Sequence, residues 1–174
     1  MKHKRIKITQ EMIDEAIALT PQTKVNRTRA SKIDSLTGNI GEFIFAQYYL
    51  GDWRKHQVVE NKGEIDFDNI EIKTSAFPFN NKLNLLVRED YAAKRKPDFY
   101  VQIIIDVKHR NADTIHAGTD AVLCGFATHS DLDHAEKRDF GSKSGWSSGY
   151  KCYAIPITEL HSVDKLPRNN VQNI

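Results

Sequence analysis

Two carboxylates and one lysine lie close together in two short segments that alternate polar and apolar residues. The segments span 64–67 and 70–73, and the three side chains are Asp66, Glu71 and Lys73. Side chains on a strand alternate between its faces, so Glu71 and Lys73 project the same way while the isoleucines beside them face the core. Asp66, on the adjacent strand or on the turn into it, can reach that same face.

Converging carboxylates and a lysine suit the hydrolysis of a phosphodiester. Two carboxylates make a hard-oxygen site for Mg²⁺, for which Mn²⁺ can substitute, and Mg²⁺ needs only one or two of them because water and phosphate oxygens complete its shell. The metal would neutralise the charge of the phosphodiester and stabilise the leaving alkoxide. Lys73 would orient or help deprotonate the attacking water, or stabilise negative charge in the transition state.

The same residue types also occur on an ordinary solvated strand face. An acid and a lysine separated by one residue will occur by chance in most chains of this size. Here the pair ends a β-branched strand, Asp66 precedes it, and a further acid, Glu42, lies upstream in the apolar helix predicted over 40–50. The combination favours a catalytic site over a solvated face.

The pattern resembles the PD-(D/E)XK nuclease superfamily, which includes many restriction endonucleases, recombination nucleases and junction resolvases. The resemblance covers about residues 38–107 and is carried by 38–43, 63–67, 70–75 and 97–101. Asp66 matches the first acid of that motif, Glu71 the second, Lys73 the lysine, and Glu42 the acid that many members carry on a helix before the sheet. Ile65 departs from the literal motif, in which proline precedes the first acid.

The resemblance implies an α/β (α+β) fold with a restriction-endonuclease-like core, in which helices flank a mixed central β-sheet. It implies a metal-dependent endodeoxyribonuclease with Glu42, Asp66, Glu71 and Lys73 as catalytic residues, the three acids also serving as Mg²⁺ ligands. Two alternatives remain open. One is a catalytically inactive DNA-binding or partner-binding module with the same fold, and the other is a nuclease that acts on RNA.

The charge distribution is compatible with a DNA partner. The net charge of the chain is only +2, but residues 1–32 carry +5 and 82–110 carry +3, whereas 33–81 carry −4. Basic segments on either side of an acidic metal site would form a phosphate-binding surface, although a mixed solvated surface would give the same totals. The residues predicted to bind nucleic acid are Lys24, Arg27, Arg29, Lys32 and, in a Gly/Ser-rich loop over 141–149, Lys143.

Residues 1–174 are predicted to form a single nuclease domain. Its core spans about 38–160, the N-terminal helix and basic segment span 1–37, and a tail over 167–174 is predicted to be flexible. Helices are predicted over 8–19 (with Thr9 as N-cap), 40–50, 89–96 and 131–138, with a short one from Thr158. Strands are predicted in 64–67 and 70–73, which a tight connection at 68–69 joins as a hairpin or meander. Further strands are predicted in 83–87, 99–107, 121–127 and 150–155, with 99–107 as a central strand covered on both faces.

The cysteines, the absence of a membrane-spanning pattern and the absence of cofactor motifs narrow the functional classes that the sequence allows. Cys124 and Cys152 lie in apolar strands and are expected to be free, buried thiols. Without an apolar run of roughly 20 residues or a signal-peptide pattern, we expect a cytoplasmic protein with no membrane partner. The phosphate-binding glycine motifs of organic cofactors and the histidine spacing of standard zinc sites are absent from the sequence. Cutting both DNA strands needs two sites, which suggests a homodimer.

Overall fold

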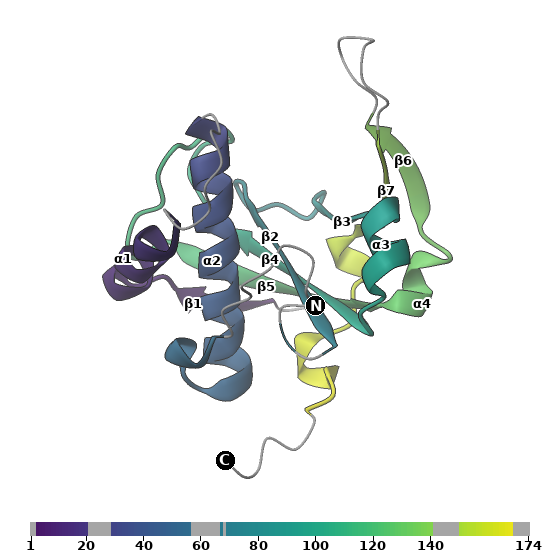
Figure 1. Cartoon of the computed structure of the whole chain (residues 1–174), viewed down its shortest axis with the longest axis horizontal. Coiled ribbons are helices and arrows are strands. Elements are labelled where there is room, and N and C mark those ends of the chain that lie inside the picture. Colours follow the sequence, from purple (N-terminus) through teal and green to yellow (C-terminus); the bar gives the residue numbers. More distant parts are fainter. Residues whose placement is uncertain (1–2, 21–28, 57–66, 68, 141–149, 169–174) are drawn as a thin grey trace.

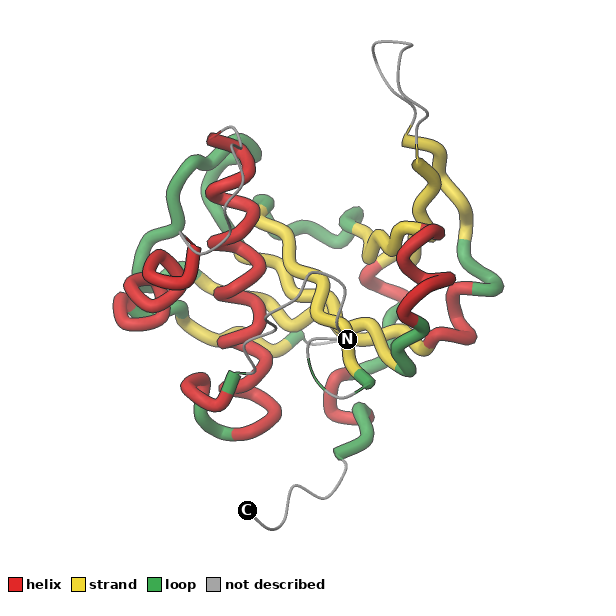
Figure 2. Tube along the Cα trace, in the orientation of Figure 1, coloured by secondary structure: helices red, strands yellow, loops and turns green. Residues whose placement is uncertain are grey.

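The computed structural model describes residues 3–20, 29–56, 67, 69–140 and 150–168, with 29–32, 95 and 140 described for the backbone alone. Within these ranges the chain forms two β-sheets with helices packed around them (Figure 1). One sheet lies beneath the two long N-terminal helices. The other carries a short helix and lies towards the opposite side of the molecule, as the tube in Figure 2 shows.

The first sheet is mixed and has four strands. In spatial order they are β1 (Lys4–Lys7), β5 (Asp120–Thr128), β4 (Phe99–Ile105) and β2 (Ile70–Ala76). β4 pairs in parallel with β2 and antiparallel with β5, so it is a central strand, as predicted. The β4–β5 register shifts at Gln102, opposite Gly125, where the backbone of His161 passes so close that a Cβ atom would lie 2.5 Å from its carbonyl oxygen.

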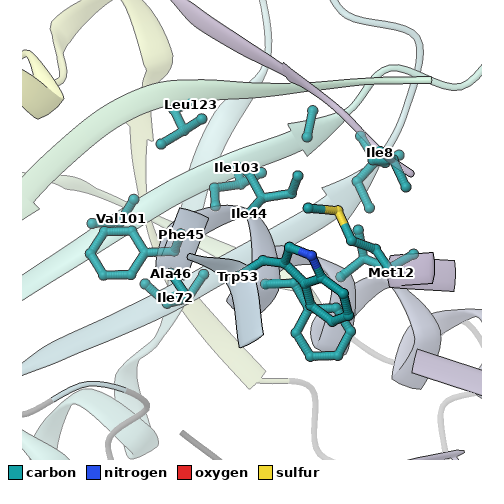
Figure 3. Packing of buried hydrophobic residues seen from close by; sticks show 14 of the residues in the cluster. Ile8, Met12, Ile44, Phe45, Ala46, Trp53, Ile72, Val101, Ile103 and Leu123 are labelled. Atoms are coloured by element: carbon teal, nitrogen blue, oxygen red, sulfur yellow. The ribbon is translucent and has the colours of Figure 1, made fainter. Parts of the chain in front are cut away.

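Helices α1 (Gln10–Leu19) and α2 (Arg29–Leu50) cover one face of this sheet. Thr9 caps α1 by accepting a hydrogen bond from the backbone N–H of Met12, in agreement with the prediction. The apolar side of α2, including Ile44 and Phe45, packs against Ile72 of β2 and its neighbours on β4 and β5 (Figure 3). Burying this large apolar cluster is what fixes the helices against the sheet.

The second sheet is antiparallel, in the order β3 (Asn84–Arg88), β7 (Tyr150–Pro156) and β6 (Glu136–Phe140). Helix α3 (Glu89–Arg95) follows β3, and Lys96 ends it in a left-handed conformation with φ of 42°. The apolar residues of β3 and β7 share a second buried cluster with Tyr100 and Ile104 of β4. The first sheet therefore has an apolar core on each face.

Several predictions agree with this architecture and several are wrong. The mixed sheet flanked by helices is observed, and both cysteines are buried free thiols. β1 was not predicted, and α2 begins well before residue 40. The predicted helix over 131–138 is wrong: α4 (His129–Leu132) ends after one turn, and the chain then enters β6. A capping box between Thr128 and Asp131 begins α4 at His129, before the predicted start. The polar segment that follows α4 is a strand because it pairs with β7.

The remaining helices are single turns. They are η2 (Trp53–Lys55), η3 (Ile157–Glu159) and η4 (Val163–Lys165), the second of which overlaps the helix predicted from Thr158. Pro167 and Arg168 contact α2, since the backbone oxygen of Pro167 accepts a hydrogen bond from the Tyr49 hydroxyl and the Arg168 guanidinium lies over the Tyr48 ring. In the part of the chain that is described, no helix is long and apolar enough to span a membrane.

Candidate functional site

Glu71 and Lys73 form a close ion pair on β2. The Lys73 Nζ atom donates to Glu71 Oε1 at 2.7 Å. Glu71 is buried, with 7% of its side chain exposed, and the Lys73 side chain is 25% exposed. These two residues therefore do not lie on a fully solvated strand face. A carboxylate taken this far out of water needs a charged or hydrogen-bonding partner, and Lys73 supplies one.

The strand places both charged side chains on the sheet face that lies away from α1 and α2. Ile70 and Ile72, the residues that alternate with them, pack into the core beneath the helices, as the alternation of strand side chains predicts. In the parallel register of β2 and β4, Glu71 lies beside Tyr100 and Lys73 beside Gln102. Each partner is itself buried on the same face as the ion pair.

Gln102 fixes the backbone at the position of Lys73. Its side-chain amide donates to the carbonyl oxygen of Lys73 at 3.1 Å and to that of Ile103 at 2.9 Å. Only 1% of Gln102 is exposed, so these hydrogen bonds form away from bulk water. We did not predict a role for Gln102, because a lone glutamine within an apolar strand carries no motif. Its placement depends on the β2–β4 register, which the sequence does not reveal.

A tight turn leads the chain into β2. Phe67 and Ile70 form an antiparallel bridge, with hydrogen bonds from Phe67 N to Ile70 O at 3.0 Å and from Ile70 N to Phe67 O at 2.5 Å. This reversal agrees with the hairpin predicted between the two alternating segments. Asp66, the first acid of the predicted site, immediately precedes Phe67 in sequence but lies outside the described residues.

Glu42 lies on α2, where that helix crosses β2. Gly41 packs so closely on Thr74 that a Cβ atom added to the glycine would lie 1.8 Å from the Thr74 Oγ1 atom. This contact is on the helix-covered face of the sheet, whereas Glu71 and Lys73 project from the other face. The structure thus brings Glu71 and Lys73 together and places the partly buried Glu42 on an element that covers the opposite side of β2.

The side chains of the residues predicted to bind nucleic acid are not described. Lys24, Arg27 and Lys143 lie outside the described residues, and only the backbone of Arg29 and Lys32 is described, in the first turns of α2. Within the described ranges, no three His, Cys, Asp or Glu side chains gather in a group that could hold a metal ion. Among the predicted metal ligands, the described part of the site accordingly offers one buried carboxylate, that of Glu71.

A cluster of charged and aromatic side chains lies on the neighbouring sheet. Arg88, the last residue of β3, pairs in register with Cys152 of β7 and makes hydrogen bonds from its Nε and Nη2 atoms to the Asp90 carboxylate at 3.0 and 2.8 Å. Burial raises the pKa of the Cys152 thiol, while the positive charges of Arg88 and Lys73 act in the opposite direction.

No protein family, curated protein or solved structure matches the chain significantly.

Proposed function

We propose that the protein is a metal-dependent endodeoxyribonuclease that hydrolyses DNA phosphodiester bonds at Glu71 and Lys73, on a restriction-endonuclease-like core. The observation that carries the proposal is the partly buried Glu71–Lys73 pair at 2.7 Å on a strand entered through a tight turn. Asp66 stands just before that turn in the sequence. An acid before the turn, and an acid and a lysine on one face after it, are the arrangement that the motif requires.

The donor chemistry fits a hard divalent cation. Glu71 supplies a buried carboxylate, and Asp66 would supply the second, which is as many as Mg²⁺ usually takes from a protein. When bound, Mg²⁺ or Mn²⁺ would neutralise the phosphodiester charge and stabilise the leaving oxygen. Glu42 would join the site directly or through water only by reaching around β2 from the helix side, so it is assigned a supporting role.

Lys73 is the residue that distinguishes catalysis from mere binding. Its ammonium group is held by Glu71, and the backbone that carries it is held by Gln102. A fixed cation at this position can orient the attacking water or stabilise the charge that develops on the phosphoryl oxygens, without rearranging during the reaction. Burial strengthens that effect because the local dielectric is lower than that of water.

The alternative is a catalytically inactive DNA-binding or partner-binding module, in which Glu71 and Lys73 form a structural ion pair. The 2.7 Å distance is equally suited to that role. Partly buried ion pairs give little net stability compared with apolar residues of the same size. A purely structural pair would therefore be replaceable by an apolar pair, whereas a catalytic pair would not be.

A cleavage panel tests the proposal directly. Purified protein would be incubated with supercoiled, linear, branched and single-stranded DNA, and with RNA, in Mg²⁺, in Mn²⁺ and in excess chelator. We expect nicking of DNA with either metal and none in chelator. The RNA arm separates a deoxyribonuclease from a ribonuclease. Undiminished cutting in chelator would refute the metal requirement, and an absence of cutting in every arm would favour the inactive module.

A further inference from the structure

Lys96 has a backbone conformation that residues with a side chain rarely adopt. Its φ is 42°, and it is the only non-glycine residue with positive φ among those described. A Cβ atom is strained in this left-handed conformation, so a helix that ends in this way usually carries glycine at the position. Here an exposed lysine ends α3, and its backbone N–H donates to the carbonyl oxygen of Ala92 at 3.3 Å. Strained residues concentrate at functional sites, which directs attention to what the Lys96 side chain can bind.

The corner between α3 and β4, residues 96–98, is anchored to other parts of the fold. Pro97 is buried. The carbonyl oxygen of Asp98 accepts a hydrogen bond from the backbone N–H of His129 at 3.0 Å. Directly after the corner, the N–H of Phe99 donates to the carbonyl oxygen of Asn69 at 3.1 Å. The lysine therefore projects from a backbone that is held on both sides.

This corner lies at the end of β2 where Glu71 is found. The hydrogen bond from Phe99 reaches Asn69, which is two residues before Glu71. In the parallel register of the two strands, Phe99 lies beside Ile70, and Tyr100 lies beside Glu71. The corner and the buried carboxylate are therefore only a few residues apart along neighbouring strands.

Helix α3 also lies on the face of the first sheet from which Glu71 and Lys73 project. Ala92 of α3 is buried in one cluster with Tyr100, the residue beside Glu71 on that face. Helices α1 and α2 cover the other face, as Figure 1 shows. The corner after α3 is thus on the same side and at the same end of the sheet as the Glu71–Lys73 pair.

The charge at the corner is positive. Lys94 and Lys96 are exposed, and within the described ranges neither forms an ion pair. The sequence over 94–98 contains three cations and one acid, Asp98. Cations near the end of a helix offset its dipole, but Lys94 already does so from an ordinary helical position. The helix dipole therefore does not account for a lysine at the strained position.

We infer that Lys96 binds a backbone phosphate of the DNA, beside the phosphodiester that is cleaved at Glu71 and Lys73. The inference rests on the proposed function and deepens it, because it adds a residue that positions the substrate. A cation on an anchored corner loses less freedom on binding than one on a loose segment. Glycine at this position would relieve the backbone and remove the contact, so stability and DNA binding should respond in opposite directions.

Binding without cleavage tests this contact. Fluorescence anisotropy in chelator would compare the full-length wild type with Lys96→Gly, Lys96→Arg and Lys108→Ala on a fluorescein-labelled DNA duplex over a range of salt concentrations. Lys96→Gly should weaken binding roughly 5- to 10-fold at about 0.1 M salt. It should also reduce the slope of log affinity against log salt by about 0.9, the contribution of one phosphate contact. Its melting temperature should equal or exceed that of the wild type, because glycine relieves the left-handed backbone.

The other two variants are matched controls. Lys96→Arg keeps a cation on the same backbone and should retain the affinity and the slope. Lys108 is also exposed and forms no ion pair within the described ranges, but it follows β4 and so lies at the opposite end of that strand. Lys108→Ala should therefore leave binding unchanged. Should the glycine variant melt early, Lys96→Asn repeats the test, since asparagine also tolerates the left-handed conformation.

Wild-type affinity and slope in the neutral variants of Lys96 would overturn the inference. An equal loss in Lys108→Ala would overturn it as well, because the attraction would then be diffuse. The outcome is separable from that of the proposed function. If the wild type cleaves DNA and Lys96→Gly binds DNA normally, the phosphate contact is refuted and the nuclease stands. If Lys96→Gly loses binding as expected but the wild type never cleaves with either metal, the contact stands and the nuclease is refuted.

Discussion

The Nζ atom of Lys73 lies 2.7 Å from Oε1 of Glu71, two residues away on the same strand face. The carboxylate is the more deeply buried of the two groups. Lys73 therefore offsets part of the cost of burying the Glu71 carboxylate, and removing the lysine alone takes its cation away from a buried charge beside Tyr100 and Gln102.

A double-mutant cycle on this pair should reveal strong coupling. We expect Lys73→Met to lower the free energy of unfolding by about 1–3 kcal/mol, because Glu71 keeps a buried charge without its cation. The double variant Glu71→Gln/Lys73→Met should recover most of that loss, since it buries no charge. Urea unfolding of the wild type, Glu71→Gln, Lys73→Met and the double variant measures the coupling. Additive effects would show that the pair behaves as two independent solvated residues.

Gly41 should not tolerate even one added methyl group. Alanine there would place its Cβ atom 1.8 Å from Thr74 Oγ1 and 2.7 Å from Thr74 Cβ, so α2 would have to move away from β2. We expect Gly41→Ala to cost about 1–3 kcal/mol through overpacking, and the swap Gly41→Ala/Thr74→Gly to restore part of it. Gly38→Ala, on the same helix with open space around it, is the control and should be neutral or stabilising.

Gln102 should contribute to stability through its two hydrogen bonds. Gln102→Leu has nearly the same volume but leaves the carbonyl oxygens of Lys73 and Ile103 without these donors. The expected loss is about 1–3 kcal/mol in unfolding free energy, measured by urea titration. The control is Gln10→Leu, because Gln10 is exposed and donates only at the surface, to Asp14. Similar small effects of both changes would argue against a fixed backbone at Lys73.

Cys124 should be inert in the folded protein and should make the fold sensitive to alkali. Burial raises the pKa of its thiol to about 12. The unfolded chain loses that proton near the ordinary thiol pKa of about 8.5, so between these values the folded state binds more protons and stability falls as pH rises. The urea midpoint should therefore drop less steeply above pH 9 in Cys124→Ala than in the wild type. Rapid labelling of Cys124 in the native protein at pH 8 would contradict this account.

The placement of Glu71 and Lys73 on one face was predictable, because it follows from the two-residue period of a strand. Ile70 and Ile72 identify the buried face, and the charged residues must then point the other way. The central position of β4 was also predictable, because all of its residues except Gln102 are apolar or aromatic. Such features depend on neighbouring residues alone.

Features that depend on distant partners could not be predicted. Gln102 finds its role through register with a strand about thirty residues earlier, and Arg88 through packing against a ring on β7. β6 consists almost entirely of charged residues, so its sequence has no strand period, and it is a strand because β7 pairs with it. The polar first half of α2 likewise has too weak an apolar pattern to be recognised as helix.

In the proposed mechanism, Lys73 acts in the reaction and Glu71 holds the metal. Calorimetry of Mn²⁺ binding alongside single-turnover DNA cleavage tests it, using the wild type, Glu71→Gln and Lys73→Ala. We predict that Glu71→Gln loses both metal affinity and cleavage. Lys73→Ala should bind Mn²⁺ as well as the wild type or better, yet cleave roughly 10²- to 10³-fold more slowly, the usual loss for a group that stabilises transition-state charge. Cleavage by Lys73→Ala at the wild-type rate would contradict the account.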